Sequence, residues 1–319
     1  MKALEKQLHF ELTRFNTSFK EIETVFIGGG TPSTISPSLY APIFKLITPY
    51  LKDNAEITTE ANPNSASFEW LEGMYHLGVN RISFGVQSFN EKKLKALNRS
   101  HTPLQAQTAI KNASLIGFKN ISLDIIYNYK NDTKALLEND ITIAFTLPIN
   151  HISAYELTIE ENTLFASTPQ VKQENEALAF FVTNFIEKKG FQSYEISNFG
   201  TYQSNHNKGY WKLKNYIGAG AGAVGFLNKS RFYPQTDIEA YIKDPLIIKE
   251  EVLTKEELLT EQIFLGLRSC IGIKKSLLNP TMLKNASFLV QEQKLKEDQS
   301  HFYNTNFFLS DELALFILG

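Results

Sequence analysis

The feature that most constrains the fold is a regular succession of short β-rich segments separated by stretches with helical patterning. The segments begin 32, 25, 39 and 31 residues apart, a spacing that fits repeated strand–helix units and a parallel sheet. The expected strands are Thr24–Ile27, Glu56–Glu60, Arg81–Gly85, Asn120–Ile126 and His151–Leu157. The expected helices are 36–51, 67–77, 103–116, 133–146 and 173–189. Five strands cannot close an eight-stranded barrel, so the prediction is an α/β fold with an open or partial sheet.

The rest of the chain follows other patterns. Apolar residues at positions 4, 8, 12 and 15 predict a helix from the first turn onward, and no Ser, Thr, Asp or Asn precedes them as an N-cap. The strand–helix alternation fades after about residue 165, and the pattern becomes helical from about residue 236, notably in Leu253–Arg268. We therefore predict three parts: residues 1–165, 166–235 and 236–319.

Composition excludes several classes of protein. A hydrophobic content of 43% and an aromatic content of 12% indicate a folded core rather than a disordered chain. The formal net charge of −2 gives no reason to expect nucleic-acid or anionic-membrane binding. No apolar run is long enough to span a bilayer, and no signal peptide is recognisable, so we expect a cytoplasmic protein that is not integral to a membrane. Cys270 is the only cysteine, which excludes an intramolecular disulfide.

Unusual polar residues gather where the five expected strands end. They are Gly28–Thr31, Glu60 with Asn62, Gln87 with Ser88, Asp124, and Glu156. The carboxyl ends of parallel strands carry the site in α/β barrels, and the repetition over five strands favours a site here. At any single position the alternative is that a polar residue only marks where a strand stops.

Three consecutive glycines, Gly28, Gly29 and Gly30, follow the first expected strand. Without a Cβ, their backbone N–H and C=O groups can approach a ligand closely. The segment is neither a phosphate-binding loop with a Lys-Ser/Thr pair nor a dinucleotide fingerprint. Taken alone, the triplet fits a tight strand–helix turn as well as a cofactor contact.

The segments that follow help to decide between a tight turn and a cofactor contact. They are Glu60-Ala61-Asn62-Pro63, Gly78–Phe89 (GVNRISFGVQSF), Leu97–His101 (LNRSH) and Ser122–Tyr127 (SLDIIY). In this order they resemble the radical S-adenosylmethionine (SAM) enzymes related to oxygen-independent coproporphyrinogen oxidase, and the likeness covers most of residues 22–160. The resemblance implies a partial parallel (β/α) barrel over residues 1–165.

The same resemblance implies a SAM site. Its residues would be Gly28, Gly29, Gly30, Thr31, Glu60, Gln87, Arg99 and Asp124. The glycine turn would take the methionyl end, Arg99 suits a carboxylate through its planar fork, and Asp124 would accept from a ribose hydroxyl or the amine. The alternatives are a capping Glu, a buried amide and a surface salt bridge. The resemblance assigns no catalytic residue.

The second half resembles the HemW-type haem chaperones within this group. The segments that carry the likeness are Tyr194–Phe199 (YEISNF), His206–Trp211 (HNKGYW), Gly220–Ala223 and Leu265–Arg268. The resemblance implies haem binding by His206, Tyr210 and Trp211, delivery to haem-accepting proteins, and a winged-helix-like part at 236–319. A His beside aromatic residues is otherwise a hydrogen-bonded core residue. His101 and His151 are interpreted as structural or SAM-side residues.

The chain also departs from the family pattern. The Cys-x-x-x-Cys-x-x-Cys motif that holds a [4Fe–4S] cluster is absent, so we expect no cluster in this chain. We predict that the motif and a first strand precede residue 1, so that Met1 is not the natural start or the gene has lost its beginning. Asn128–Asn131 replaces the usual Gly-Leu-Pro-Gly, and Val224-Gly225 replaces His-Ser. Two alternatives to a haem chaperone therefore stay open: a coproporphyrinogen oxidase of porphyrin biosynthesis, whose activity we do not expect, and a scaffold without a cluster.

Overall fold

The computed structural model describes residues 1–159 and 169–319, and these residues form two compact units. The sheet unit comprises Thr24–Ser38 and Glu56–Gln203. The second unit comprises Met1–Glu23, Leu39–Ala55 and Ser204–Gly319. The boundaries expected near residues 165 and 235 stay predictions.

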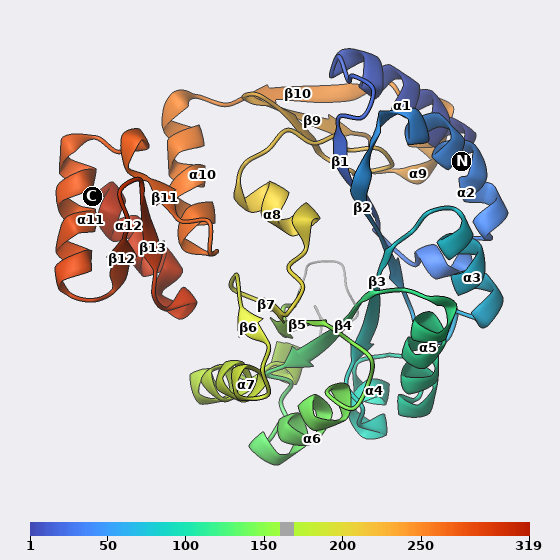
Figure 1. Ribbon diagram of the computed structural model, residues 1–319, viewed down its shortest axis with the longest axis horizontal. Coiled ribbons are helices and arrows are strands. Elements are labelled where there is room, and N and C mark those ends of the chain that lie inside the picture. The colour runs from blue at the N-terminus through green and yellow to red at the C-terminus, as the bar shows by residue number, and fades with distance from the viewer. Residues whose placement is uncertain (160–168) are drawn as a thin grey trace. The chain divides into compact units, whose positions relative to one another are not determined.

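A seven-stranded sheet organises the first unit, with strand order β1-β2-β3-β4-β5-β7-β6 (Figure 1). The strands are β1 (Ile22–Ile27), β2 (Leu51–Ala61), β3 (Arg81–Gln87), β4 (Asn120–Tyr127), β5 (His151–Glu156), β6 (Gln192–Ser193) and β7 (Asn198–Gly200). Strands β2 to β5 run parallel to one another, whereas β7 pairs antiparallel with both β5 and β6. The expected open α/β sheet and its five strands are confirmed, and the antiparallel addition explains why the regular alternation fades after β5.

The helices of this unit are α3 (Phe68–His76), α4 (Glu91–Ala96), α5 (Pro103–Ile116), α6 (Lys134–Ala144) and α7 (Glu176–Lys188). Their starts follow from local chemistry, because Ser67, Thr102, Thr133 and Asn175 each accept a hydrogen bond from a backbone N–H of the first turn. At α5 the cap is reinforced by a capping box between Thr102 and Gln105, with Pro103 at the first helical position.

The two faces of the sheet differ in polarity. On one face Ile82, Phe84, Leu123 and Ile152 are fully buried, and α5, α6 and α7 pack against β3 and β4. The alternate positions of the same strands carry polar residues, because side chains along a strand point to opposite faces. They are Arg81, Ser83, Ser122, Asp124, His151 and Ser153. The helix-free face of this half-barrel is therefore unusually polar for a parallel sheet, whose strands are normally apolar on both faces.

Two elements differ from the sequence-based expectation. The helix expected over 36–51 is α2 (Pro37–Ile47), and Leu51 already belongs to β2. A 3₁₀ turn, Thr48–Tyr50, follows α2, and Pro49 within it lacks the backbone N–H that would continue the α-helical hydrogen bonds. The short helix α4 was not expected at all.

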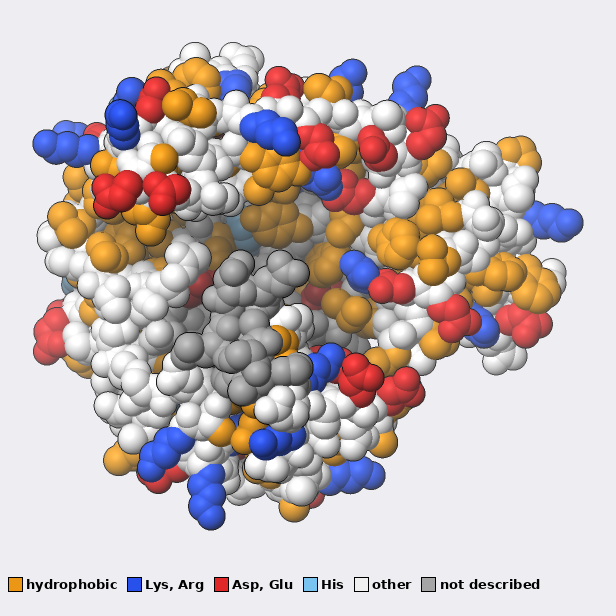
Figure 2. All heavy atoms as spheres, turned by 180° about the vertical axis from the view of Figure 1, so that it is seen from behind, with side chains coloured by type: hydrophobic (Ala, Val, Ile, Leu, Met, Phe, Trp, Pro, Cys, Tyr) orange, Lys and Arg blue, Asp and Glu red, His pale blue; other side chains and the backbone are white. Residues whose placement is uncertain are grey.

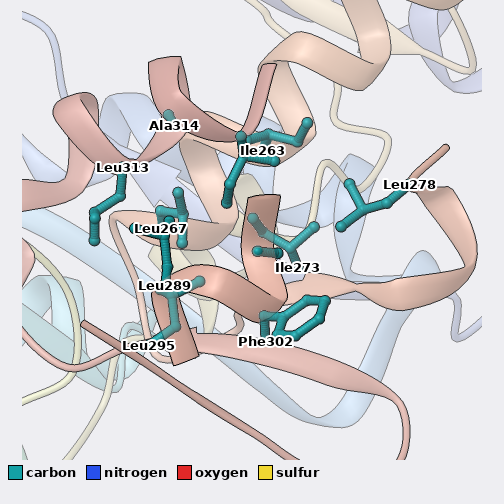
Figure 3. Packing of buried hydrophobic residues seen from close by; sticks show 11 residues of the cluster. Ile263, Leu267, Ile273, Leu278, Leu289, Leu295, Phe302, Leu313 and Ala314 are labelled. Carbon is teal, nitrogen blue, oxygen red and sulfur yellow. The ribbon is translucent and has the colours of Figure 1, made fainter. Parts of the chain in front are cut away.

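The second unit contains the expected N-terminal helix α1 (Lys2–Arg14) and two three-stranded antiparallel sheets. Its other elements are α8 (Asn205–Trp211), β8 (Gly225–Leu227), β9 (Ser230–Pro234), α9 (Ile238–Lys243), β10 (Ile248–Val252), α10 (Lys255–Leu267), β11 (Ile273–Lys274), α11 (Pro280–Gln291), β12 (Leu295–Glu297), β13 (His301–Asn304) and α12 (Ser310–Leu318). The C-terminal elements share one apolar cluster, in which Leu267, Leu289, Phe302 and Leu313 are almost completely buried (Figure 3). Three helices on a small sheet fit the expected winged-helix-like part.

Helix α1 is tied to the glycine-rich turn at 218–222 by a buried side chain. Gln7 Nε2 donates to the Gly218 carbonyl over 3.2 Å, and Gln7 Oε1 accepts from Gly220 N over 2.9 Å. The Tyr241 hydroxyl donates to the same oxygen over 2.7 Å. The Gln7 side chain is also hydrogen-bonded to the Glu11 carboxyl group. These partners account for a glutamine with no exposure on a surface helix.

Candidate functional site

The glycine turn after β1 is shaped around Glu60. Gly29 and Gly30 have φ angles of +78° and +118°, a conformation that favours glycine. A Cβ on Gly28 would lie 2.7 Å from the Phe26 ring and 3.0 Å from the Glu60 carboxyl group. Gly29 N donates to Glu60 Oε2 over 3.3 Å. The turn therefore needs glycine for close approach at Gly28 and for backbone conformation at the next two positions.

Thr31 and the strand end of β2 are connected beside this turn. Asn62 Nδ2 lies 3.5 Å from Thr31 Oγ1, and Asn62 N donates to Ser33 Oγ over 3.0 Å. These contacts join the segment after the glycines to the Glu-x-Asn-Pro segment. Both were predicted to belong to one site, and the fold brings them together.

Asp124 stands at the centre of the polar face. Ser83 Oγ donates to its Oδ1 over 3.4 Å, and the Ser153 side chain is also hydrogen-bonded to the carboxyl group. Burial raises the pKa of Asp124 to about 6, and the nearby Glu60 carboxylate contributes to the rise. Burial likewise raises the pKa of Glu60. Two carboxyl groups with weakened ionisation are thus placed on β2 and β4, on either side of β3, and such groups are common in binding and active sites.

Gln87 is the last residue of β3, and Arg99 follows α4. Gln87 is buried and has a φ of +67°, at a point where the pairing of β3 with β4 becomes irregular. This is a costly backbone conformation for a residue other than glycine, and such residues cluster at functional sites. Burial lowers the pKa of Arg99, while the negative charge of Asp124 acts in the opposite direction. The fold therefore places the Arg99 charge within electrostatic reach of Asp124.

The two histidines interpreted as structural are buried and hydrogen-bonded. A ring nitrogen of His101, Nε2, lies 3.0 Å from the Val86 carbonyl oxygen. His151 lies between Ser122 Oγ, at 2.6 Å from Nδ1, and the Tyr194 hydroxyl, at 2.8 Å from Nε2. Burial holds the pKa of His151 well below its usual range. A neutral, doubly hydrogen-bonded imidazole organises the polar face.

Sequence reasoning missed most of this polar face. Beyond the strand ends, the face includes Arg81, Ser83, Ser122 and Ser153. A pattern was available: the triplets Arg-Ile-Ser, Ser-Leu-Asp and His-Ile-Ser each place polar residues two apart in an expected buried strand. Glu156, at the end of β5, is exposed and forms a 3.1 Å ion pair with Lys172; its expected place in the site stays a prediction.

The turn after β4, where the chain departs from the family pattern, is held by side-chain hydrogen bonds. Asn128 adopts a φ of +63°, which asparagine tolerates better than most residues. Asp132 Oδ2 accepts from Tyr129 N over 3.0 Å, and Gln173 Nε2 donates to the Tyr129 carbonyl over 2.9 Å. Asn128 thus takes the left-handed position that a glycine could fill, and side chains fix the rest of the turn.

The second candidate set lies on α8, in the other unit. The Ser204 side chain caps this helix by accepting from Asn207 N over 3.2 Å. His206 and Tyr210 are one helical turn apart, with Nε2 3.0 Å from the phenolic oxygen and the rings edge to face at 4.8 Å. Tyr210 also contacts the Tyr216 ring at 4.7 Å and is 41% exposed. Trp211 Nε1 has no acceptor among residues 1–159 and 169–319.

The residues present do not fit an iron–sulfur cluster. Such clusters are held by several thiolates, whereas the chain has a single cysteine, the exposed Cys270. No group of three or more His, Cys, Asp or Glu side chains with metal-binding geometry occurs in the described part of the chain. No helix of the described residues is long and apolar enough to cross a membrane. Figure 2 shows Lys, Arg, Asp and Glu side chains interspersed on the face it presents, without a continuous area of one sign.

Comparisons with known proteins agree with this picture. The family described as the Radical SAM superfamily matches residues 10–142. The chain is 35% identical to the Heme chaperone HemW of Bacillus subtilis, over 76% of this chain and 66% of that protein. It is 39% identical to the Heme chaperone HemW of Escherichia coli, over 65% of this chain and 56% of that protein. The chain therefore spans about 56–66% of the length of these two curated relatives.

The fold has a solved counterpart. The structure of coproporphyrinogen III oxidase (HemN) from Escherichia coli superposes with a TM-score of 0.79, covering 99% of this chain and 82% of that one at 16% identity. Identity at that level shows a shared fold alone. Together with the polar strand-end site and the sequence relatives, it leads to one conclusion: the chain belongs to the HemW-type family of the radical SAM superfamily.

Proposed function

We propose that this protein binds haem and delivers it to acceptor proteins, as the names of its relatives indicate for them, and that it does so in the cytoplasm. The observation that carries the proposal is the His206–Tyr210 pair on α8. An imidazole nitrogen is a common axial ligand of haem iron. The adjoining aromatic rings offer apolar surface to a porphyrin face, where burial contributes about 25 cal/mol per Å².

The other part of the proposal is that the strand ends of the sheet unit bind SAM. The glycine turn would hold the methionyl end, Asp124 would accept from the ribose or the amine, and Arg99 would meet the carboxylate. The densely polar face around Asp124 supports this assignment, because parallel strands otherwise carry apolar residues. In relatives a [4Fe–4S] cluster supplies the electron for radical chemistry, and we assign no such step to this chain.

The main rival is an oxidase that acts on coproporphyrinogen III, suggested by the shared fold. Anaerobic incubation of the chain with SAM, a reductant and coproporphyrinogen III, followed by chromatography of the porphyrins, separates the two functions. The haem-chaperone proposal expects unchanged substrate. Formation of a decarboxylated product would favour the oxidase.

Substitution of Gly28 by Ala tests the SAM assignment. The added Cβ meets the Phe26 ring at 2.7 Å and the Glu60 carboxyl group at 3.0 Å, so the turn or Glu60 must move. We expect SAM affinity, measured by equilibrium dialysis, to fall at least about tenfold, equivalent to about 1.4 kcal/mol. Gly209→Ala is a suitable control, because open space surrounds that position. Equal affinities for wild type and Gly28→Ala would remove the turn from the site.

Substitution of His206 by Ala tests the haem assignment. We expect a shifted Soret band or weaker affinity, because an axial ligand is lost while the aromatic surface remains. His76→Ala is the control: His76 is exposed at the end of α3 and is not part of the His206–Trp211 motif. If wild type and His206→Ala gave the same spectrum and affinity, His206 would not be the ligand.

A further inference from the structure

A row of polar residues crosses three strands of the sheet unit. Ser153 of β5 is paired with Asp124 of β4 on one side and with Asn198 of β7 on the other. Residues directly opposite each other in a sheet point to the same face. Neighbouring strands are about 4.8 Å apart, so Asn198 lies two strand spacings beyond Asp124 on the polar face.

Asn198 has an unused hydrogen-bonding atom at the end of this row. Its side chain is 3% exposed, and its Oδ1 has no donor among the described residues, 1–159 and 169–319. Buried polar atoms are nearly always paired. An exception on a face that also carries the candidate SAM residue Asp124 favours a donor from outside the described chain at this position.

Glu195 lies beside this atom and is buried as well, with 2% exposure. Its carboxyl group accepts from Ser197 N over 3.1 Å and from the side chain and backbone of Asn198. These partners are neutral, and no ion pair to Glu195 occurs in the described part of the chain. Burial raises the pKa of Glu195 to about 7, because the lost hydration of the anion outweighs these hydrogen bonds from neutral groups.

Tyr155 links the two ends of the row. Its side chain is hydrogen-bonded to Ser153, and burial followed by the negative charges of Asp124, Glu195 and Glu60 raises its pKa above the usual range. The residue is nevertheless 42% exposed. Tyr155 is thus close to these carboxylates and still reached by solvent, so this part of the polar face is not a sealed core.

We propose that Asn198 Oδ1 and the Glu195 carboxyl group, here called the acceptor pair, form a second binding subsite that takes an ammonium group of a ligand. An ammonium group supplies an N–H donor for Asn198 Oδ1 and a positive charge that pairs with the Glu195 carboxylate. A neutral hydroxyl would satisfy Asn198 alone. Neither residue of the acceptor pair is among the candidate SAM residues. In the sheet order, four strands lie between β7 and β1.

The amino group in question therefore belongs to a second molecule. In the proposed function the amino end of SAM lies at the glycine turn after β1 or donates to Asp124, and neither place includes Glu195 or Asn198. The subsite proposal depends on the proposed function only in treating the strand ends as a ligand site.

The test uses two probes of equal size, butylammonium and 1-butanol, titrated into the full chain labelled with ¹⁵N. The side-chain NH₂ signal of Asn198 is the reporter. We expect the Asn198 signal to shift and saturate as butylammonium is added. The affinity for butanol should be at least tenfold weaker. Glu195→Gln keeps the shape and removes the charge, so it should abolish the preference for the ammonium. Glu156→Gln, at an exposed carboxylate on the end of β5, should leave it unchanged.

Equal responses to both probes, no saturable response, or a preference that survives Glu195→Gln would overturn the subsite; in each case Asn198 would bind water or a neutral group. SAM is titrated in parallel into wild type and Glu195→Gln. If the wild-type protein did not bind SAM, the proposed function would be contradicted and the subsite would not. Failure of butylammonium with normal SAM binding would contradict the subsite alone.

Discussion

Replacing Asp124 by Asn should weaken SAM binding and at the same time stabilise the folded protein at neutral pH. In the folded state burial raises the pKa of Asp124 from 3.8 to about 6. Between about pH 4 and 6, Asp124 therefore keeps its proton in the folded protein but has lost it in the unfolded chain. The free energy of unfolding falls as the pH rises through this range. At about 1.4 kcal/mol per pKa unit, ionised Asp124 costs the folded state about 2–3 kcal/mol at pH 7.

We expect Asp124→Asn to raise the free energy of unfolding at pH 7 by about 1–3 kcal/mol, with little difference at pH 4. SAM affinity should fall about 10–100-fold, because hydrogen bonds to a charged group contribute about 1.5–3 kcal/mol. Urea unfolding at both pH values and equilibrium dialysis measure the two effects. Glu72→Gln, at an exposed position of α3, serves as the control. A variant that is less stable at pH 7 and binds SAM normally would refute a functional role for Asp124.

Loss of the Lys93 charge should destabilise the sheet unit strongly. Lys93 is 2% exposed, and its Nζ lies 2.8 Å from Asp132 Oδ1 and 2.6 Å from the Ile126 carbonyl oxygen. Asp132 in turn accepts from Tyr129 N and shapes the turn that follows β4. Lys93→Met would leave the Asp132 carboxylate buried without its partner, which costs about 3–5 kcal/mol.

Chemical unfolding followed by circular dichroism measures this effect. Lys92→Met, at an exposed position of the same helix, should change the free energy of unfolding by less than about 0.5 kcal/mol. Adding Asp132→Asn to Lys93→Met should restore part of the loss, because the asparagine can still accept from Tyr129 N without a buried charge. If the single and double variants were equally unstable, the cost would come from lost packing and not from the unpaired carboxylate.

The sequence predicted the sheet well because its physical determinants are local. Alternation of apolar residues defined β3, β4 and β5 almost to the residue, and the Thr102-Pro103 start of α5 was readable as a cap. The order of the motifs then predicted that Gly28, Glu60 and Asp124 lie at strand ends. In the fold, Glu60 contacts the glycine turn and acts electrostatically on Asp124. Their role in SAM binding stays a prediction.

Other parts of the site depend on contacts that are distant in the chain. Asn198 meets Ser153 only because β7 turns back antiparallel beside β5, and short strands such as β6 and β7 carry too little periodicity to be recognised. The role of Gln7 depends on partners more than 200 residues away. Polar residues inside expected strands gave a usable pattern, yet polarity alone does not distinguish a buried network from a solvated face.

The central claim is that this chain binds haem at one site, and an absorption titration of haem into the wild-type protein tests it most directly. Bound haem is followed at the Soret band, and the amount is determined independently as the pyridine haemochrome. The account predicts a shifted band that saturates near one haem per chain. A spectrum that stays that of free haem, or absorbance that grows without saturation, would contradict it.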